Sequence, residues 1–298
     1  MLVRLFILNR ALLKLHRNHY KTNHAAYTIE IVEYLLGRKK ALFITPPSAV
    51  YQHEGTIYWK KKYMTYSEYN YLRSGTASFF KKQHFEEVLR LTKDFFHKYN
   101  VIDFGCGDGI FIYSLAKCFN SVVGVDVNLG SIEIASKLVS ELNLSNVKLI
   151  CNNKLTIDHI KTNMTENNYH ILYLLETLEH TGDNSALYTS KINFLKELFT
   201  LLDDGGIIVI SVPKMIGISF LVQRFGLMIF DMPRDQISII NLLKTSLLDD
   251  TSDLEKLWNG EHLGFNHKKL EVHLMNEFQI VKKKSLLFQV LYVIREPN

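Results

Sequence analysis

A run of alternating glycines between an apolar segment and a helical segment is the feature that most constrains this chain. Residues 101–112 read VIDFGCGDGIFI, so Gly105, Gly107 and Gly109 alternate after Asp103. Glycine permits a tight turn and lets a ligand lie against bare backbone. The helix that follows offers free N–H groups to a polar or anionic ligand. The pattern predicts a strand–turn–helix unit that binds a ligand at the turn.

From Val101 onward, the sequence pattern predicts strands and helices in alternation. Several of the strand segments are continuous apolar runs, which are typical of strands buried on both faces of a parallel sheet. The alternation of strands and helices predicts a doubly wound α/β domain. The last two strands leave no room for a helix between them, so the link at 282–285 predicts an antiparallel hairpin. The predicted strands are 101–104, 121–125, 147–151, 171–175, 207–212, 278–281 and 286–294, and the predicted helices are 79–98, 110–119, 131–142, 191–202 and 268–276.

The glycine spacing excludes the nicotinamide-binding fingerprint. That fingerprint is G-x-G-x-x-G. Counted from Gly105 its third glycine falls on Ile110, and counted from Gly107 it falls on Ile112.

The spacing instead resembles motif I of the class I S-adenosylmethionine-dependent methyltransferases. Three later segments agree in order: SVVGVDVN, ending near Asp126; YHILYLLETLEH, similar to the E-x-x-E-H ending of the ubiquinone-type O-methyltransferase and methyltransferase type 11 group; and FLKELFTLLDDGGIIVISVP. The resemblance covers residues 80–213 and 262–298. It implies a Rossmann-like methyltransferase fold, a seven-stranded mainly parallel sheet with an antiparallel last hairpin, and S-adenosylmethionine as cofactor.

The resemblance also assigns the cofactor-binding residues. The methionine end is assigned to Asp103, Gly105, Cys106, Gly107 and Gly109, and the ribose to Asp126. The adenine is assigned to Val127, Asn152 and Asn153, and the floor near the sulfonium to Leu175 and Glu176. Asn153 stands where the family usually has Asp, so the contact to the adenine would carry less charge.

Methyl transfer is an in-line displacement, and an oxygen or nitrogen acceptor must lose a proton. His180 and Glu179 end the fourth strand beside the expected methyl group, so they are the candidate catalytic bases; for His180 the alternative is an ordering hydrogen bond to a loop. His262 is a third candidate, with a loop contact as its alternative. Dispersed histidines without spaced acidic ligands do not make a metal site, so we expect metal-independent transfer.

The distribution of charge separates the N-terminus from the rest of the chain. Residues 1–30 hold five basic residues and one acidic residue, hence +4 of the net +5, so the rest of the chain is near neutral and unlike a nucleic-acid-binding surface. Three cysteines without a CxxC pair indicate a reducing compartment. We divide the chain into an N-terminal helical and aromatic extension (1–78), a cofactor-binding core (79–213), a lid insertion (214–261) and a C-terminal part of the core (262–298).

The substrate is expected at the lid. The tyrosine-rich segment 51–73 and the apolar segment 217–230 are its candidate walls, and the alternative for 217–230 is a helix packed on the core of the lid. Residues 1–20 or 217–230 are candidates for peripheral contact with a membrane, in an otherwise cytoplasmic protein. In residues 1–20 the candidate is a basic amphipathic helix with Arg10, Lys14 and Arg17 on one face; the alternatives are a helix that packs its leucines on the domain, or an over-long start to the open reading frame. We expect a small-molecule, lipid or saccharide acceptor. The alternatives are an RNA or protein methyltransferase, disfavoured because no N/D-P-P-Y tetrapeptide follows the fourth strand, and a non-catalytic binding protein.

Overall fold

The computed structural model describes residues 42–51, 65–72, 76–153, 156–164, 168–229, 237–256, 258–260 and 262–297. The candidate basic helix of residues 1–20, the end of the apolar segment 217–230 and most of the tyrosine-rich segment 51–73 lie outside the described residues.

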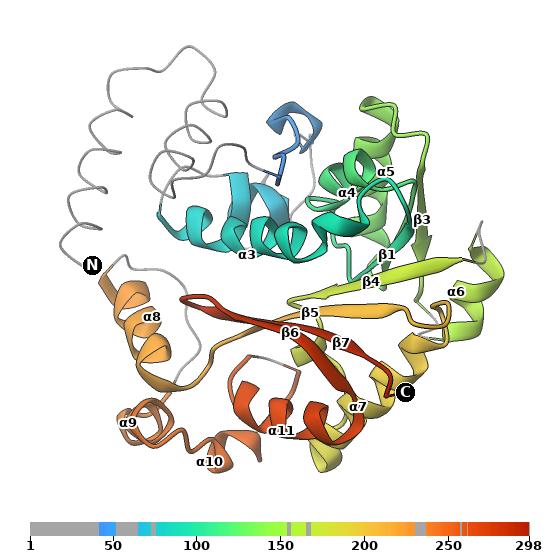
Figure 1. The fold of residues 1–298 in the computed structure, drawn as a ribbon. Helices are drawn as coiled ribbons and strands as arrows, with labels where there is room; N and C mark the ends of the chain where they lie inside the picture. The colour runs from blue at the N-terminus through green and yellow to red at the C-terminus, as the bar shows by residue number, and fades with distance from the viewer. Residues whose placement is uncertain are drawn as a thin grey trace, which may run out of the picture.

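A seven-stranded sheet in the order β3-β2-β1-β4-β5-β7-β6 forms the centre of the molecule (Figure 1). The first five strands pair in parallel, and β7 pairs antiparallel to both β5 and β6. The predicted fold class is therefore confirmed. The strands are β1 (Asn100–Phe104), β2 (Ser121–Asp126), β3 (Val147–Cys151), β4 (Tyr169–Leu175), β5 (Ile207–Pro213), β6 (Gln279–Ser285) and β7 (Gln289–Arg295).

Helices cover both faces of the sheet, which explains why its central strands are buried and mainly apolar (Figure 1). Every residue of β1 and β5 is buried. One face carries α3 (Thr76–Thr92), α4 (Ile112–Cys118) and α5 (Leu129–Glu141). The other carries α6 (Ile157–Asn163), α7 (Leu187–Phe199) and α11 (His267–Glu277). Two apolar cores, one on each side of the sheet, therefore hold the domain together.

The last hairpin differs from the sequence prediction. Residues 282–285, predicted as the link, lie within β6, where Lys282 pairs with Val293 and Lys284 with Leu291. The turn falls between Ser285 and Gln289 instead. The reason is that β6 is the edge strand and largely exposed, so no apolar pattern marks it; lysines on an edge also discourage pairing with another chain.

An insertion of three helices separates β5 from α11. It comprises α8 (Gly217–Ile229), α9 (Ile239–Leu247) and α10 (Ser252–Glu255). Phe220 of α8 is fully buried, whereas Ile218 is 71% and Phe225 53% exposed. The segment 217–230 therefore forms a helix that packs with one side and exposes apolar side chains on another. Within the described ranges, no helix has the length and apolar character to cross a bilayer.

The described residues also include five short helical turns. They are η1 (Ser48–Tyr51), η2 (Glu68–Leu72), η3 (Lys93–Phe95), η4 (Leu178–His180) and η5 (Asn184–Ala186). Two of them matter for the site, because η2 approaches the glycine turn and η4 follows the end of β4.

The strand order reverses between β1 and β4, since the chain first adds β2 and β3 on one side of β1 and then β4 and β5 on the other. In open α/β sheets, ligands bind outside the carboxyl ends of the strands at such a switch point. The glycine turn after β1 and the ETLEH segment after β4 both lie there.

Candidate active site

The glycine turn is open on one side and tightly packed on the other. Gly105 and Gly107 have φ of +81° and +55°, a left-handed backbone that glycine adopts without strain. A Cβ on Gly105 would lie 2.2 Å from Oγ1 of Thr177, whereas a Cβ on Gly107 would meet no described atom within 4 Å. Gly105 therefore allows the segment after β4 to pack against the turn, and Gly107 leaves backbone free for a ligand.

Asp103, at the end of β1, is almost completely buried. Its Oδ2 has no hydrogen-bond partner among the residues that the structure describes. Burial, and secondarily the charge of Asp126, raises the pKa of Asp103 to about 8. A buried carboxylate with a free oxygen is a suitable partner for a ligand ammonium group.

Asp126, at the end of β2, is held by the backbone. Its Oδ2 accepts a hydrogen bond from the N–H of Gly107 and its Oδ1 accepts one from the N–H of Asn128, both at 2.8 Å. Each carboxylate oxygen keeps lone pairs for further donors. Val127 beside it is 49% exposed. This arrangement fits two ribose hydroxyls at Asp126 and an apolar contact at Val127.

The end of β3 adds an amide. Asn152 is buried, and its Oδ1 has no hydrogen-bond partner within the described part of the chain, whereas Asn153 is exposed. The N–H of Asn152 donates to the carbonyl of Asp126 at 2.8 Å, which fixes the two strand ends together. Asn152 is thus the buried amide of the predicted pair. Two buried acceptor oxygens, Oδ2 of Asp103 and Oδ1 of Asn152, lie at the same edge of the sheet as the open face at Gly107. Together they fit the ammonium group, ribose and base of S-adenosylmethionine.

The end of β4 is strained and polar. Glu176 has φ of +50°, which is uncommon for a residue with a side chain. Its Oε1 accepts a hydrogen bond from Oγ of Ser211 on β5 at 2.6 Å, and burial raises its pKa to about 7. Leu175 before it is buried, as expected for the floor of the cofactor site.

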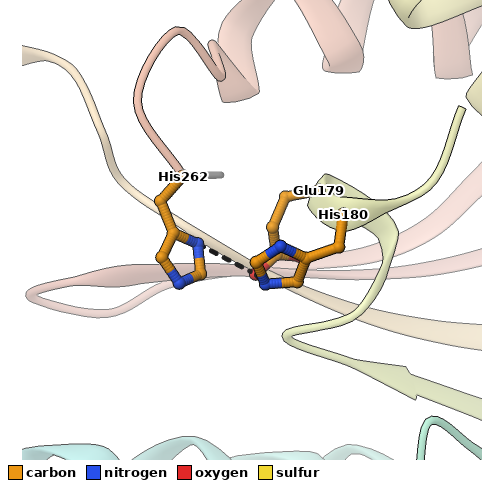
Figure 2. A group of neighbouring side chains, drawn as sticks. All are labelled: Glu179, His180 and His262. Carbon is orange, nitrogen blue, oxygen red and sulfur yellow. Dashed lines mark ion pairs between the residues drawn. The ribbon is translucent and has the colours of Figure 1, made fainter. Parts of the chain in front are cut away.

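Glu179, His180 and His262 form a carboxylate–imidazole cluster just beyond this strand end (Figure 2). Nδ1 of His262 lies 3.5 Å and Nε2 of His180 lies 3.8 Å from Oε1 of Glu179. The Glu179 side chain is fully buried, whereas the two imidazoles are 42% (His180) and 41% (His262) exposed. Burial, followed by the charge of Glu176, raises the pKa of Glu179 well above its usual range. The fold therefore brings together the three predicted catalytic residues.

Lys191 fixes the turn that carries this cluster. Its side chain is fully buried, although lysine is rarely found inside. Nζ donates hydrogen bonds to the carbonyl oxygens of Leu178 at 3.0 Å, Glu179 at 3.1 Å and Thr181. It also lies 4.6 Å from the centre of the Trp258 ring. The signal for it in the sequence is a lysine on the inward side of α7.

Asp108 is a second buried polar residue at the site that is absent from the candidates predicted from the sequence. Its Oδ2 accepts a hydrogen bond from the N–H of Ser67 at 2.7 Å, and its Oδ1 accepts one from the Ser67 hydroxyl. Burial raises the pKa of Asp108. These bonds tie the segment before η2 to the glycine turn, so the described end of the tyrosine-rich segment borders the cofactor site.

Comparison with known proteins agrees with this geometry. A methyltransferase-domain family model matches residues 76–242, more than half of the 298-residue chain. No curated protein matches.

Solved structures share the fold at low sequence identity. The PH0226 protein from Pyrococcus horikoshii OT3 is 15% identical, with 78% of this chain and 96% of that chain covered and a TM-score of 0.54. The N-methyltransferase NodS from Bradyrhizobium japonicum WM9 in complex with S-adenosyl-L-homocysteine is 15% identical, with 74% and 88% covered and a TM-score of 0.46. A SAM-dependent methyltransferase from Aquifex aeolicus is also 15% identical, with 72% and 93% covered and a TM-score of 0.45.

The sheet order, the glycine turn with its free backbone and the family match support one assignment. The chain belongs to the methyltransferase domain family, as a class I enzyme that uses S-adenosylmethionine.

Proposed function

We propose that this methyltransferase transfers the methyl group of S-adenosylmethionine to a hydroxyl oxygen of a small molecule with an apolar part, such as a lipid intermediate. In this reaction the O–C bond forms as the S–C bond breaks. The sulfur keeps the electron pair and becomes the thioether of S-adenosylhomocysteine, and the hydroxyl proton leaves. The observation that carries the proposal is the carboxylate–imidazole cluster beside the cofactor turn.

The position of the cluster supports a role at the acceptor. Thr177, whose side chain packs against Gly105, precedes Glu179 by two residues, so the cluster lies close to the glycine turn. An alcohol holds its proton tightly at neutral pH, and transfer to it gains from a group that removes this proton. A cluster of one carboxylate and two half-exposed imidazoles can do this for a bound hydroxyl.

The exposed apolar surface of the insertion supports an apolar acceptor. Ile239 and Ile240 of α9 are 76% and 68% exposed, and Ile218 and Phe225 of α8 are also exposed. These helices directly follow β5, whose carboxyl end lies at the site edge of the sheet. An acceptor with a hydrocarbon chain, or one presented at a membrane surface, would gain contact with such side chains.

The test is methyl transfer from labelled S-adenosylmethionine to a panel of acceptors, with mass spectrometry to identify the methylated atom. The panel pairs a prenylated phenol with the same phenol lacking the chain, and adds amines, saccharides and total RNA. We expect O-methylation of the prenylated phenol, weaker transfer to the short analogue, and no product with Asp126→Ala. Methylation confined to amines or to RNA would overturn the proposal.

A further inference from the structure

We propose that Glu179, His180 and His262 bind a divalent metal ion, and that the open positions of this ion receive the acceptor hydroxyl. The second half of this proposal rests on the proposed function; the first half does not. Because the histidines are dispersed along the chain, the sequence alone predicts metal-independent transfer. In space they are adjacent, so the premise of that expectation does not hold.

The spacing of the ligand atoms is the first argument. One atom from each of the three side chains lies within 4.8 Å of the others. Oε1 of Glu179 is 3.5 Å from Nδ1 of His262 and 3.8 Å from Nε2 of His180. Metal–ligand bonds of ~2.1 Å place neighbouring ligand atoms roughly 3.0–3.5 Å apart. The two distances to Glu179 lie in or near this range, and side-chain shifts of roughly 1 Å would bring all three atoms around one ion.

The buried carboxylate of Glu179 is the second argument. Neither of its oxygens accepts a hydrogen bond from any residue that the structure describes, although the side chain is fully buried. Lys191, which contacts the same turn, uses its ammonium group for three backbone carbonyls rather than for this carboxylate. Buried charges in proteins are usually paired or coordinate metals. A cation between the carboxylate and the two imidazoles would satisfy Glu179.

The orientation of His180 is the third argument. Its Nδ1 lies 2.5 Å from the carbonyl oxygen of Gly260, and because a carbonyl only accepts, Nδ1 carries the proton. The neutral ring then has a bare lone pair on Nε2, the atom that faces Glu179. A backbone carbonyl that fixes a histidine tautomer in this way is typical of metal-ligating histidines. Gly260 precedes His262 by two residues, so one loop supplies a ligand and orients another.

The donor set indicates the class of ion and its task. Two imidazoles and one carboxylate suit Zn²⁺, Fe²⁺, Mn²⁺ or Co²⁺, and three protein ligands leave positions open for an exogenous oxygen. Because both imidazoles are half-exposed, solvent and an acceptor can reach an ion held there. An ion there lowers the pKa of a bound hydroxyl. The hydroxyl proton then passes to water, and the oxygen attacks the methyl group as described above.

The test is a titration of the EDTA-treated, dialysed full-length protein with Co²⁺, followed by its visible absorption, and with Zn²⁺ or Mn²⁺ by calorimetry. We expect one equivalent to bind, and His262→Asn and Glu179→Gln each to weaken binding at least tenfold, as the loss of one ligand should. His97→Asn is the matched control, because His97 is exposed and precedes β1 at the opposite end of the strands. S-adenosylhomocysteine affinity, measured on every variant, shows that the fold is kept.

Absence of binding to the wild type, or equal binding by wild type and His262→Asn, would overturn the metal site. The acceptor role has a separate test in the methyl-transfer assay, where EDTA should abolish O-methylation and the added ion should restore it. Stoichiometric binding with EDTA-insensitive transfer would support the metal site and overturn its role at the acceptor. Binding without any O-methylated acceptor would support the site and count against the proposed function.

Discussion

The cofactor half and the acceptor half of the site are built in different ways. The cofactor half comprises the glycine turn with Asp103, Asp126 and Asn152. Its polar groups lie at the ends of three neighbouring strands, and the carboxylate of Asp126 already accepts two backbone hydrogen bonds. In the acceptor half, the carboxylate–imidazole cluster joins residues 82 positions apart, and the Glu179 carboxylate accepts no hydrogen bond from the described residues. The first half is preformed by local backbone, whereas the second is completed by a ligand.

The largest expected effect separates the two halves. Asp126→Ala removes the carboxylate that accepts from the N–H groups of Gly107 and Asn128 and that we assign to the two ribose hydroxyls. We expect affinity for S-adenosylhomocysteine to fall about a thousandfold, or about 4 kcal/mol. Calorimetry measures this loss, with the exposed Asp204→Ala as the matched control. Metal binding should be unchanged; a fall of less than fivefold in cofactor affinity would contradict the assigned role of Asp126.

The converse change tests the acceptor half. His180→Asn removes the imidazole whose Nε2 faces Glu179, and we expect kcat to fall about a hundredfold because the acceptor proton is no longer removed efficiently. Affinity for S-adenosylhomocysteine should stay within twofold, since the His180 side chain contacts Gly260, Glu179 and His262, none of which is assigned to the cofactor. His97→Asn is again the control. Equal losses of kcat and cofactor affinity would mean that the two halves act as one unit.

A smaller effect is expected for Lys191, which fixes the turn that carries the carboxylate–imidazole cluster. Lys191→Met keeps the length of the side chain but leaves three carbonyl oxygens around η4 without their donor. We expect about 2 kcal/mol lower stability in urea unfolding, together with weaker metal binding. Lys196→Met, on the exposed side of α7, is the control. Full metal affinity in Lys191→Met would show that the cluster does not depend on this lysine.

The smallest effect concerns the proton on Asp103. With a pKa of about 8, Asp103 is mostly protonated in the free protein at pH 7, and an ammonium group bound beside it favours the carboxylate. Cofactor binding at pH 7 should therefore release close to one proton, seen by calorimetry in two buffers of different ionisation enthalpy. No release would mean that Asp103 does not meet the ammonium group.

The same residue makes a prediction for stability. Its folded-state pKa lies above that of the unfolded chain, so between pH of about 4 and about 8 the folded protein holds a proton that the unfolded chain has lost. This contribution to stability falls as pH rises through that window. Asp103→Asn should remove it, raising Tm relative to the wild type at pH 8 but not at pH 4. An equal difference at both pH values would contradict the assignment.

The sequence alone predicts the fold, and it indicates which strand ends form the cofactor half. Periodic apolar runs are local signals, and the DFGCGDG turn with Asp126 ends adjacent parallel strands, so their meeting follows from topology alone. The exposed edge strand β6 was misjudged in part because an edge buries little and so shows no apolar pattern.

Only the tertiary structure decided the acceptor half. Gly260 and His262 follow the insertion in the chain and contact His180 and Glu179 of η4. No spacing along the chain predicts these contacts. Lys191 and the buried carboxylate of Glu179 acquire their meaning from burial, which removes water and leaves each charged group dependent on the partners that the fold supplies. A pattern along the chain reports which residues are inside, but the distance between Glu179 and His262 exists only in the folded molecule.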